Sequence, residues 1–237
     1  MAQSSLLVSL ANGVDVLWTS GRYLYDRQTR EVPTADCNDR LAAMFHRYLD
    51  AAKVQLTVRG DVDRTRPYIV MSNHQSLYDI PVLFEAFGPQ LRMIVKKEIS
   101  RVPFWGPALR ESRFVFVGRA SPETARANLL EAQGVLASGL SVWIAPEGTR
   151  SKDGQLGPFK MGGFHMALDT GCPILPVTVD GTRNVLPAGA IRTNLDQPVS
   201  VVFHAPIDPK EFGPNTKGSR QALAEAVRQA IQGGFAR

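Results

Sequence analysis

The stretch SNHQSLYD, residues 72–79, decides how the rest of this 237-residue chain is interpreted. The apolar run YIVM at residues 68–71 precedes it and predicts a short buried strand. Apolar residues at helical spacing follow it over residues 80–87 and predict a helix. His74 is therefore expected at the carboxyl end of a strand, just before a helix, which is where open α/β sheets bind their ligands.

His74 and Asp79 are five residues apart, which on one continuous helix would place them on different faces. They can meet only if His74 lies in the turn and Asp79 in the first turn of the helix. The carboxylate would then hold one imidazole nitrogen and leave the other free as a general base. Ser76 and Asp79 also fit a capping box with Ser76 as the N-cap, in which the carboxylate only closes the helix. The spacing leaves both interpretations open.

The composition limits the class of partner. Lysine and arginine number 27 against 22 acidic residues, a formal net charge of +5. This excess suits a phosphate, a membrane surface or an acidic carrier protein. No basic run with interleaved aromatic residues is present, so we expect no nucleic-acid partner. Cys37 and Cys172 lack metal-ligand spacing, and we expect neither a metal site nor a disulfide framework.

Residues 1–52 predict a helical hairpin ahead of the main domain. Charged and amide residues interrupt its apolar stretch, so no membrane-spanning helix is expected. A second helix should begin near residues 36–38. The first helix, over residues 4–25, carries one apolar stripe: Leu7, Leu10, Val14, Leu17, Trp18, Leu24 and Tyr25. This stripe either packs on the core or lies in a membrane interface, where Trp and Tyr rest at headgroup level.

Residues 53–237 predict an α/β domain, because strand patterns alternate with helix patterns. We expect a mainly parallel, twisted sheet flanked by helices. The expected strands cover residues 54–58, 68–71, 93–95, 114–117, 142–145, 174–179 and 199–203. One helix should start with Ser121 as its cap and Pro122 in its first position. A last helix should open at Ser219.

His74, Arg119 and the run EGTR at residues 147–150 each follow a predicted strand directly. If the strands are parallel, these residues meet at one edge of the sheet. Arg119 and Arg150 can bind a phosphate through paired guanidinium N–H groups. The glycine of the run lets the backbone approach a ligand closely, and its threonine adds a hydroxyl.

The order of the motifs resembles that of the glycerolipid acyltransferases. NHQSLYD at residues 73–79 resembles their N-H-x-x-x-x-D block. APEGTRS at residues 145–151 resembles F-P-E-G-T-R-S, with Ala145 in place of Phe. FVGR at residues 116–119 resembles F-I-x-R, although the upstream glycine usual there is missing.

Two further elements strengthen this resemblance. CPILPV at residues 172–177 is similar to the fourth, proline-containing block. KKEI at residues 96–99 resembles the K-x-E-L element between the first two blocks. The resemblance covers residues 54–204, and four ordered motifs are specific as a set.

The resemblance implies transfer of an acyl group from acyl-CoA or acyl-carrier protein to the free hydroxyl of lysophosphatidic acid. The product would be phosphatidic acid, and no further cofactor or metal would be needed. His74 would be the base and Asp79 its orienting partner. The acceptor's phosphate would be bound by Lys96, Arg119, Glu147, Gly148, Thr149 and Arg150. The bacterial members further imply a peripheral place on the cytoplasmic side of the cell inner membrane.

Other functions remain open at this point. The acceptor could be glycerol-3-phosphate, another lysophospholipid or a lyso-aminolipid. A second alternative is an inactive membrane-binding module that keeps the phosphate site, although the intact pair of His74 and Asp79 favours an enzyme. A hydrolase using His74 and Ser76 is disfavoured because the sequence has no G-x-S-x-G motif.

Overall fold

The computed structural model describes residues 4–118 and 122–235. Within them a seven-stranded sheet has the strand order β2-β9-β7-β3-β6-β4-β5. β7 and β9 pair antiparallel, and the other neighbouring strands pair parallel. The strands are β2 (Gln55–Arg59), β3 (Ile69–Ser72), β4 (Leu91–Lys96), β5 (Val115–Val117), β6 (Ser141–Ile144), β7 (Ile174–Asp180) and β9 (Pro198–Phe203). The expected α/β class with a mainly parallel sheet is confirmed.

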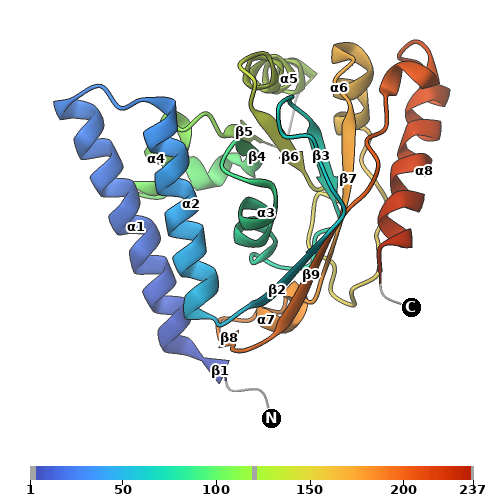
Figure 1. Ribbon diagram of the computed structural model, residues 1–237. Helices are drawn as coiled ribbons and strands as arrows, with labels where there is room; N and C mark the ends of the chain where they lie inside the picture. Colours follow the sequence, from blue (N-terminus) through green and yellow to red (C-terminus); the bar gives the residue numbers. More distant parts are fainter. Residues whose placement is uncertain (1–3, 119–121, 236–237) are drawn as a thin grey trace.

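Helices cover both faces of this sheet (Figure 1). One face carries α3 (Asp79–Phe87) and α4 (Trp105–Glu111), and the other carries α5 (Pro122–Ala137), α6 (Gly162–Thr170) and α8 (Lys217–Gly233). Successive residues of a strand point to opposite faces. Val70 accordingly packs in the first core cluster, while Ile69 and Met71 pack in the second. The apolar run Ile69–Met71 of β3 is typical of a strand in a sheet buried on both faces.

The helical hairpin consists of α1 (Leu6–Thr29) and α2 (Thr34–Ala51), which lie side by side at one end of Figure 1. This confirms the expected hairpin, with α2 starting slightly earlier than residues 36–38. Arg47 of α2 binds Asp15 of α1 through both its Nε and Nη2, at 2.9 to 3.2 Å. A two-residue strand, β1 (Ser4–Ser5), pairs antiparallel with β8 (Thr193–Asn194). No helix among the described residues is long and apolar enough to cross a membrane.

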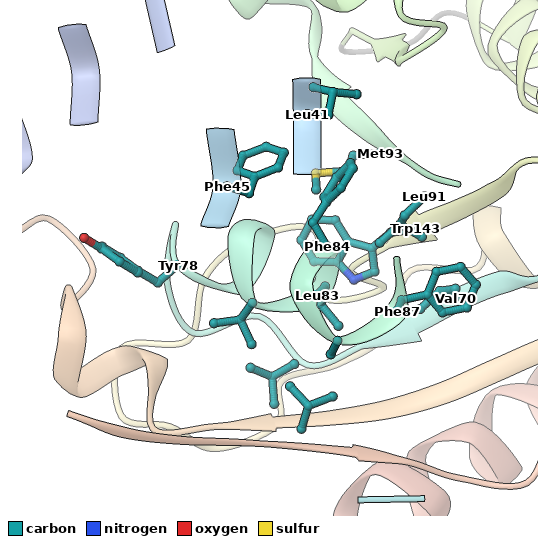
Figure 2. Packing of buried hydrophobic residues seen from close by; sticks show 14 of the residues in the cluster. Leu41, Phe45, Val70, Tyr78, Leu83, Phe84, Phe87, Leu91, Met93 and Trp143 are labelled. Carbon is teal, nitrogen blue, oxygen red and sulfur yellow. The ribbon is translucent and has the colours of Figure 1, made fainter. Parts of the chain in front are cut away.

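The hairpin shares its core with the sheet (Figure 2). Phe45 of α2 packs on Phe84 of α3, with ring centroids 4.6 Å apart. Leu41 of α2 belongs to the same buried cluster as Trp143 of β6. Each such side chain contributes about 1.5–3 kcal/mol when fully buried. The division into residues 1–52 and 53–237 stays a prediction, since both parts pack on one core.

Two helix starts differ from those expected. The last helix begins at Lys217 rather than Ser219, because Thr216 is the N-cap and its hydroxyl accepts the N–H of Ser219 at 3.1 Å. α3 begins at Asp79 with Tyr78 as its N-cap, so Ser76 is not the cap of this helix. Ser121 lies outside the described residues, while Pro122 is the first residue of α5 as expected.

Several short elements had no clear periodicity in the sequence. They include α4, which begins after Phe104, and α6, which opens with two glycines. The remaining ones are the 3₁₀ helices η1 (Lys97–Arg101) and η2 (Pro209–Phe212) and the one-turn helix α7 (Thr182–Val185). Of these, α7 matters most for the site, because it lies directly behind β7.

Candidate active site

His74 and Asp79 meet across the turn that joins β3 to α3. The His74 Nδ1 lies 2.6 Å from the Asp79 Oδ2. His74 stands in the turn and Asp79 is the first residue of the helix, which is the arrangement that their spacing requires. The carboxylate is fully buried, whereas 18% of the His74 side chain is exposed. The buried carboxylate thus holds Nδ1 of the imidazole, while another part of the ring remains accessible to solvent.

The Asp79 carboxylate is engaged on both oxygens. Oδ2 also accepts the N–H groups of Gln75, at 2.7 Å, and of Ser76, at 3.0 Å. Oδ1 accepts the hydroxyl of Thr182, the first residue of α7. An ionised carboxylate only accepts, so the imidazole donates from Nδ1 and its Nε2 keeps a lone pair in the neutral ring. Asp79 therefore closes the turn and orients His74 at once.

The turn itself is held by neighbouring side chains. Asn73 accepts the N–H of Val179 at 2.8 Å and donates to its C=O at 2.7 Å, which joins the end of β3 to β7. Trp143 of β6 meets the His74 ring edge-on, with centroids 5.6 Å apart. Its indole N–H donates to the Ser72 hydroxyl at 2.9 Å. These contacts restrict the imidazole to one place at the sheet edge.

Glu147 binds backbone groups rather than pointing into open space. Its Oε1 accepts the N–H of His74 and its Oε2 accepts the N–H of Gly157, each at 2.8 Å. The residue is only 6% exposed. Ser151 completes the link, since its N–H donates to the C=O of His74 at 2.7 Å. Both backbone polar groups of His74 are therefore fixed by the segment that follows β6.

Four other residues expected to bind phosphate are described by the structure, and each follows or ends a strand at this edge of the sheet: Gly148, Thr149, Arg150 and Lys96. Gly148 follows Glu147 with a left-handed φ of +67°. Thr149 after it is exposed and Arg150 is half-buried. Lys96 is exposed and ends β4, which is next to β6 in the sheet. Arg119 lies outside the described residues.

Two residues near the pair were missed in the sequence. Thr182, which binds Asp79, follows the strand β7 after one glycine, so the rule that polar residues gather behind parallel strands could have found it. Tyr78 precedes Asp79, and its hydroxyl lies 3.2 Å from the Asn12 Nδ2 of α1 and 3.3 Å from the Thr193 Oγ1. Burial raises the pKa of Tyr78 above its ordinary value. This buried network ties α1 to the start of α3.

The described residues hold no cluster of three or more His, Cys, Asp or Glu side chains that could bind a metal ion. The chemistry offered by the site is that of a held imidazole next to a glycine-containing turn with basic side chains. Such a set can remove a proton from a hydroxyl while an anionic group is bound nearby.

Comparisons with known proteins agree with this chemistry. The Acyltransferase family model matches residues 53–180. The chloroplastic 1-acyl-sn-glycerol-3-phosphate acyltransferase of Brassica napus is 35% identical over 161 residues, which cover 68% of this chain and 46% of that protein. The alpha enzyme of the same name from Mus musculus is 28% identical over 193 residues, covering 81% of this chain and 67% of that one. The chain thus spans about half the length of the plant relative.

A solved structure extends the likeness to almost the whole fold. The crystal structure of the 1-acyl-sn-glycerophosphate (LPA) acyltransferase from Thermotoga maritima matches with a TM-score of 0.79 and 28% identity. The match covers 98% of this chain and 96% of that chain, so it includes the helical hairpin. With a family model that spans more than half of its residues, this chain belongs to the acyltransferase family.

Proposed function

We propose that the chain transfers an acyl group from acyl-CoA or acyl-carrier protein to 1-acylglycerol-3-phosphate and so forms phosphatidic acid. One observation carries the proposal: Asp79 binds Nδ1 of His74, and the imidazole remains partly exposed beside the turn at residues 147–150. The proteins of this name among its relatives support the choice of acceptor.

The reaction needs one proton acceptor and no acyl-enzyme intermediate. His74 Nε2 takes the proton of the acceptor hydroxyl while its oxygen attacks the thioester carbonyl carbon. The C–O bond forms, the C–S bond breaks, and the departing thiolate receives the proton back from the imidazolium. Asp79 stabilises the imidazolium between these steps, in the way that a buried carboxylate serves other histidine bases. General-base catalysis of this kind contributes about a hundred- to ten-thousandfold.

The acceptor's phosphate would be bound by Thr149, Arg150, Lys96 and Arg119. Arginine forks match phosphate oxygens with two parallel hydrogen bonds. Glu147 has a different part in this proposal, because a carboxylate repels a phosphate and both of its oxygens already accept N–H groups. We assign it as a positioning residue that holds the backbone of His74.

The proposal includes peripheral binding to a membrane, on the cytoplasmic side of the inner membrane in a bacterium. The inward face of α1 carries the buried residues Asn12, Ser20 and Tyr23. Leu24 of the predicted stripe packs on the core. The rest of the stripe is exposed: Leu7, Leu10, Val14, Leu17, Trp18 and Tyr25.

This exposed row of α1 continues into a groove of about 770 Å³ that Phe104 also lines. Phe104 is itself 58% exposed. Large exposed apolar patches mark interaction sites, and an amphipathic helix with Trp and Tyr on its apolar face suits the headgroup–acyl boundary. An acceptor with one long acyl chain resides in that boundary, which supports a membrane surface as the partner of this face.

The test is an acyl-transfer assay of the full chain with labelled acyl-CoA and acyl-carrier protein. Lysophosphatidic acid, glycerol-3-phosphate, lysophosphatidylcholine and monoacylglycerol serve as acceptors in mixed vesicles. We expect turnover with lysophosphatidic acid and none with the variant His74→Ala. Turnover with another acceptor only would replace the proposed acceptor. Thioester loss without any acceptor would indicate a hydrolase, and vesicle binding without turnover would indicate an inactive module.

A further inference from the structure

Lys160 lies directly on the turn after β6. A Cβ atom added at Gly148 would come within 2.5 Å of the Lys160 Nζ and within 2.8 Å of its Cε. The ammonium therefore occupies the space that any side chain at position 148 would take. Gly148 is needed here both for its left-handed φ of +67° and for this close approach.

The backbone around Lys160 holds the side chain in this place. Its N–H donates to the C=O of Pro146 at 2.8 Å, which joins the two segments directly. The preceding residue, Phe159, packs inward on Phe164 with centroids 6.0 Å apart. The guanidinium of Arg228 covers the Phe159 ring at 4.3 Å. Phe159 is half-buried against the second core cluster, while the exposed Lys160 extends over Gly148 of the turn.

The charge of Lys160 has no protein counter-ion in the described part of the chain. No Asp or Glu oxygen there lies within 4.0 Å of its ammonium. Glu147, the nearest acid in sequence to the turn, uses its oxygens on His74 and Gly157. Among the hydrogen bonds of the described residues, none takes up the N–H of Thr149 or of Arg150.

The turn thus presents an ammonium, a guanidinium, a hydroxyl and two backbone N–H groups, for none of which the described residues supply an acceptor. Such a set of donors suits a phosphate, which offers three acceptor oxygens and a charge of about −1.5 to −2. We propose that Lys160 is a further binding residue for the phosphomonoester of the acceptor, on the turn formed by Gly148, Thr149 and Arg150. This inference rests on the proposed function and adds Lys160 to the cations already proposed for this phosphate.

The experiment compares Lys160→Met and Lys160→Arg with a matched control, Lys152→Met, in the full chain. Lys152 is an exposed lysine of the same loop that lines a different cavity, together with Arg183 and Asn184. We expect Lys160→Met to raise the KM for lysophosphatidic acid about tenfold, equivalent to about 1.4 kcal/mol. The KM for the acyl donor should stay within about twofold, and Lys160→Arg should recover most of the loss, because a cation at this place is what matters. Lys152→Met should behave as the wild type.

A second readout does not depend on turnover. The melting temperature is measured with and without inorganic phosphate and glycerol-3-phosphate. Both ligands should stabilise the wild type more than Lys160→Met, while the ligand-free melting temperatures agree. The melting temperatures test phosphate binding by Lys160 even if the wild type prefers another acceptor. Failure of the proposed function would appear in the acyl-transfer assay instead, as absent turnover with lysophosphatidic acid. Phosphate should also inhibit turnover competitively against lysophosphatidic acid.

Three results would overturn the assignment. The first is an unchanged KM for lysophosphatidic acid in Lys160→Met, or a raised KM for the donor instead. The second is equal phosphate stabilisation of wild type and variant, including none in either. The third is stabilisation by free phosphate that does not compete with lysophosphatidic acid, which would place the anion site away from the acceptor.

Discussion

Replacing Glu147 by glutamine tests whether this residue positions His74 or binds the acceptor. Glutamine keeps the shape of the side chain, but its NH₂ group must face one of the two backbone N–H groups that the carboxylate now accepts. One of the two hydrogen bonds of 2.8 Å is lost, and the glutamine NH₂ group faces a buried backbone N–H, so that two donors oppose each other. Hydrogen bonds to charged groups contribute about 1.5–3 kcal/mol, and an unsatisfied buried donor costs about 1–3 kcal/mol.

The effect on catalysis follows from the position of the imidazole. If the freed N–H is that of His74, the turn shifts, and a displacement of about 1 Å at a reacting group can cost about a hundredfold in rate. We therefore expect Glu147→Gln to lower kcat between about tenfold and a hundredfold, with the KM for lysophosphatidic acid within about twofold.

The assay is steady-state acyl transfer at varied lysophosphatidic acid, with a melting curve for each protein. Glu225→Gln is the control, because Glu225 lies exposed on α8 and accepts a hydrogen bond from Gln229 of its own helix. A raised KM with an unchanged kcat would refute the positioning role. It would favour the direct part in acceptor binding that the family resemblance implies for Glu147.

Four further predictions concern other parts of the molecule. His74→Ala should lower kcat by at least about a hundredfold with an unchanged melting curve, as measured in the same acyl-transfer assay. Arg150→Lys keeps the charge and loses the fork, so kinetics at varied acceptor and donor should show a raised KM for lysophosphatidic acid alone. Trp18→Ser combined with Leu10→Ser should weaken vesicle binding in a flotation assay by at least about tenfold. The protein should stay folded, because both side chains are exposed, and Leu130→Ser, at another exposed apolar residue on α5, is the control. Burial lowers the pKa of His204 below 6.5, so in acid the unfolded chain binds a proton that the folded chain does not. Stability should therefore fall as the pH drops below about 6.5, and chemical denaturation of His204→Asn should show a smaller loss between about pH 7 and about pH 5.5.

The structure favours point substitutions over a truncation for testing the membrane face of α1. Removing residues 1–30 would delete the buried Tyr23 and the bond between Asn12 and Tyr78, so the sheet side of the hairpin would be exposed. Loss of vesicle binding would then be mixed with loss of folding. Substitutions on the outer row of α1 avoid this, because those side chains are exposed.

The local part of the site was predictable from the sequence. A run of apolar residues, a short polar turn and an apolar pattern of helical period are all contained within residues 68–87. These few residues suffice to place His74 in the turn and Asp79 in the first helical turn, where the two side chains meet. The strand order in space was not predictable in the same way. β9 and β2 run against the direction of β7, and nothing in the alternation of strands and helices indicates this reversal.

The helical periodicity of the sequence identifies the apolar face of α1 but does not determine what this face packs against. Leu24 and Trp18 belong to one stripe of α1, yet Leu24 packs on the core and Trp18 is 70% exposed. Which of them is buried depends on where α2 and α4 pack against α1, and that geometry is set by the whole fold. Packing on the core is therefore confirmed for Leu24, whereas a membrane as the partner of the exposed residues stays a proposal.

The roles of single polar groups in the site were decided only by the tertiary structure. The sequence by itself determined that His74 and Asp79 follow one strand and the run EGTR another, because apolar runs and turns are short-range patterns. That these strands, β3 and β6, are parallel neighbours was decided by the tertiary structure. Glu147 reaches the N–H of His74 across 73 residues, and Thr182 reaches Asp79 across 103. Lys160 reaches Gly148 from a loop without periodic pattern. A hydrogen bond depends on atoms being within about 3 Å of each other, and only the packed chain brings such distant residues that close.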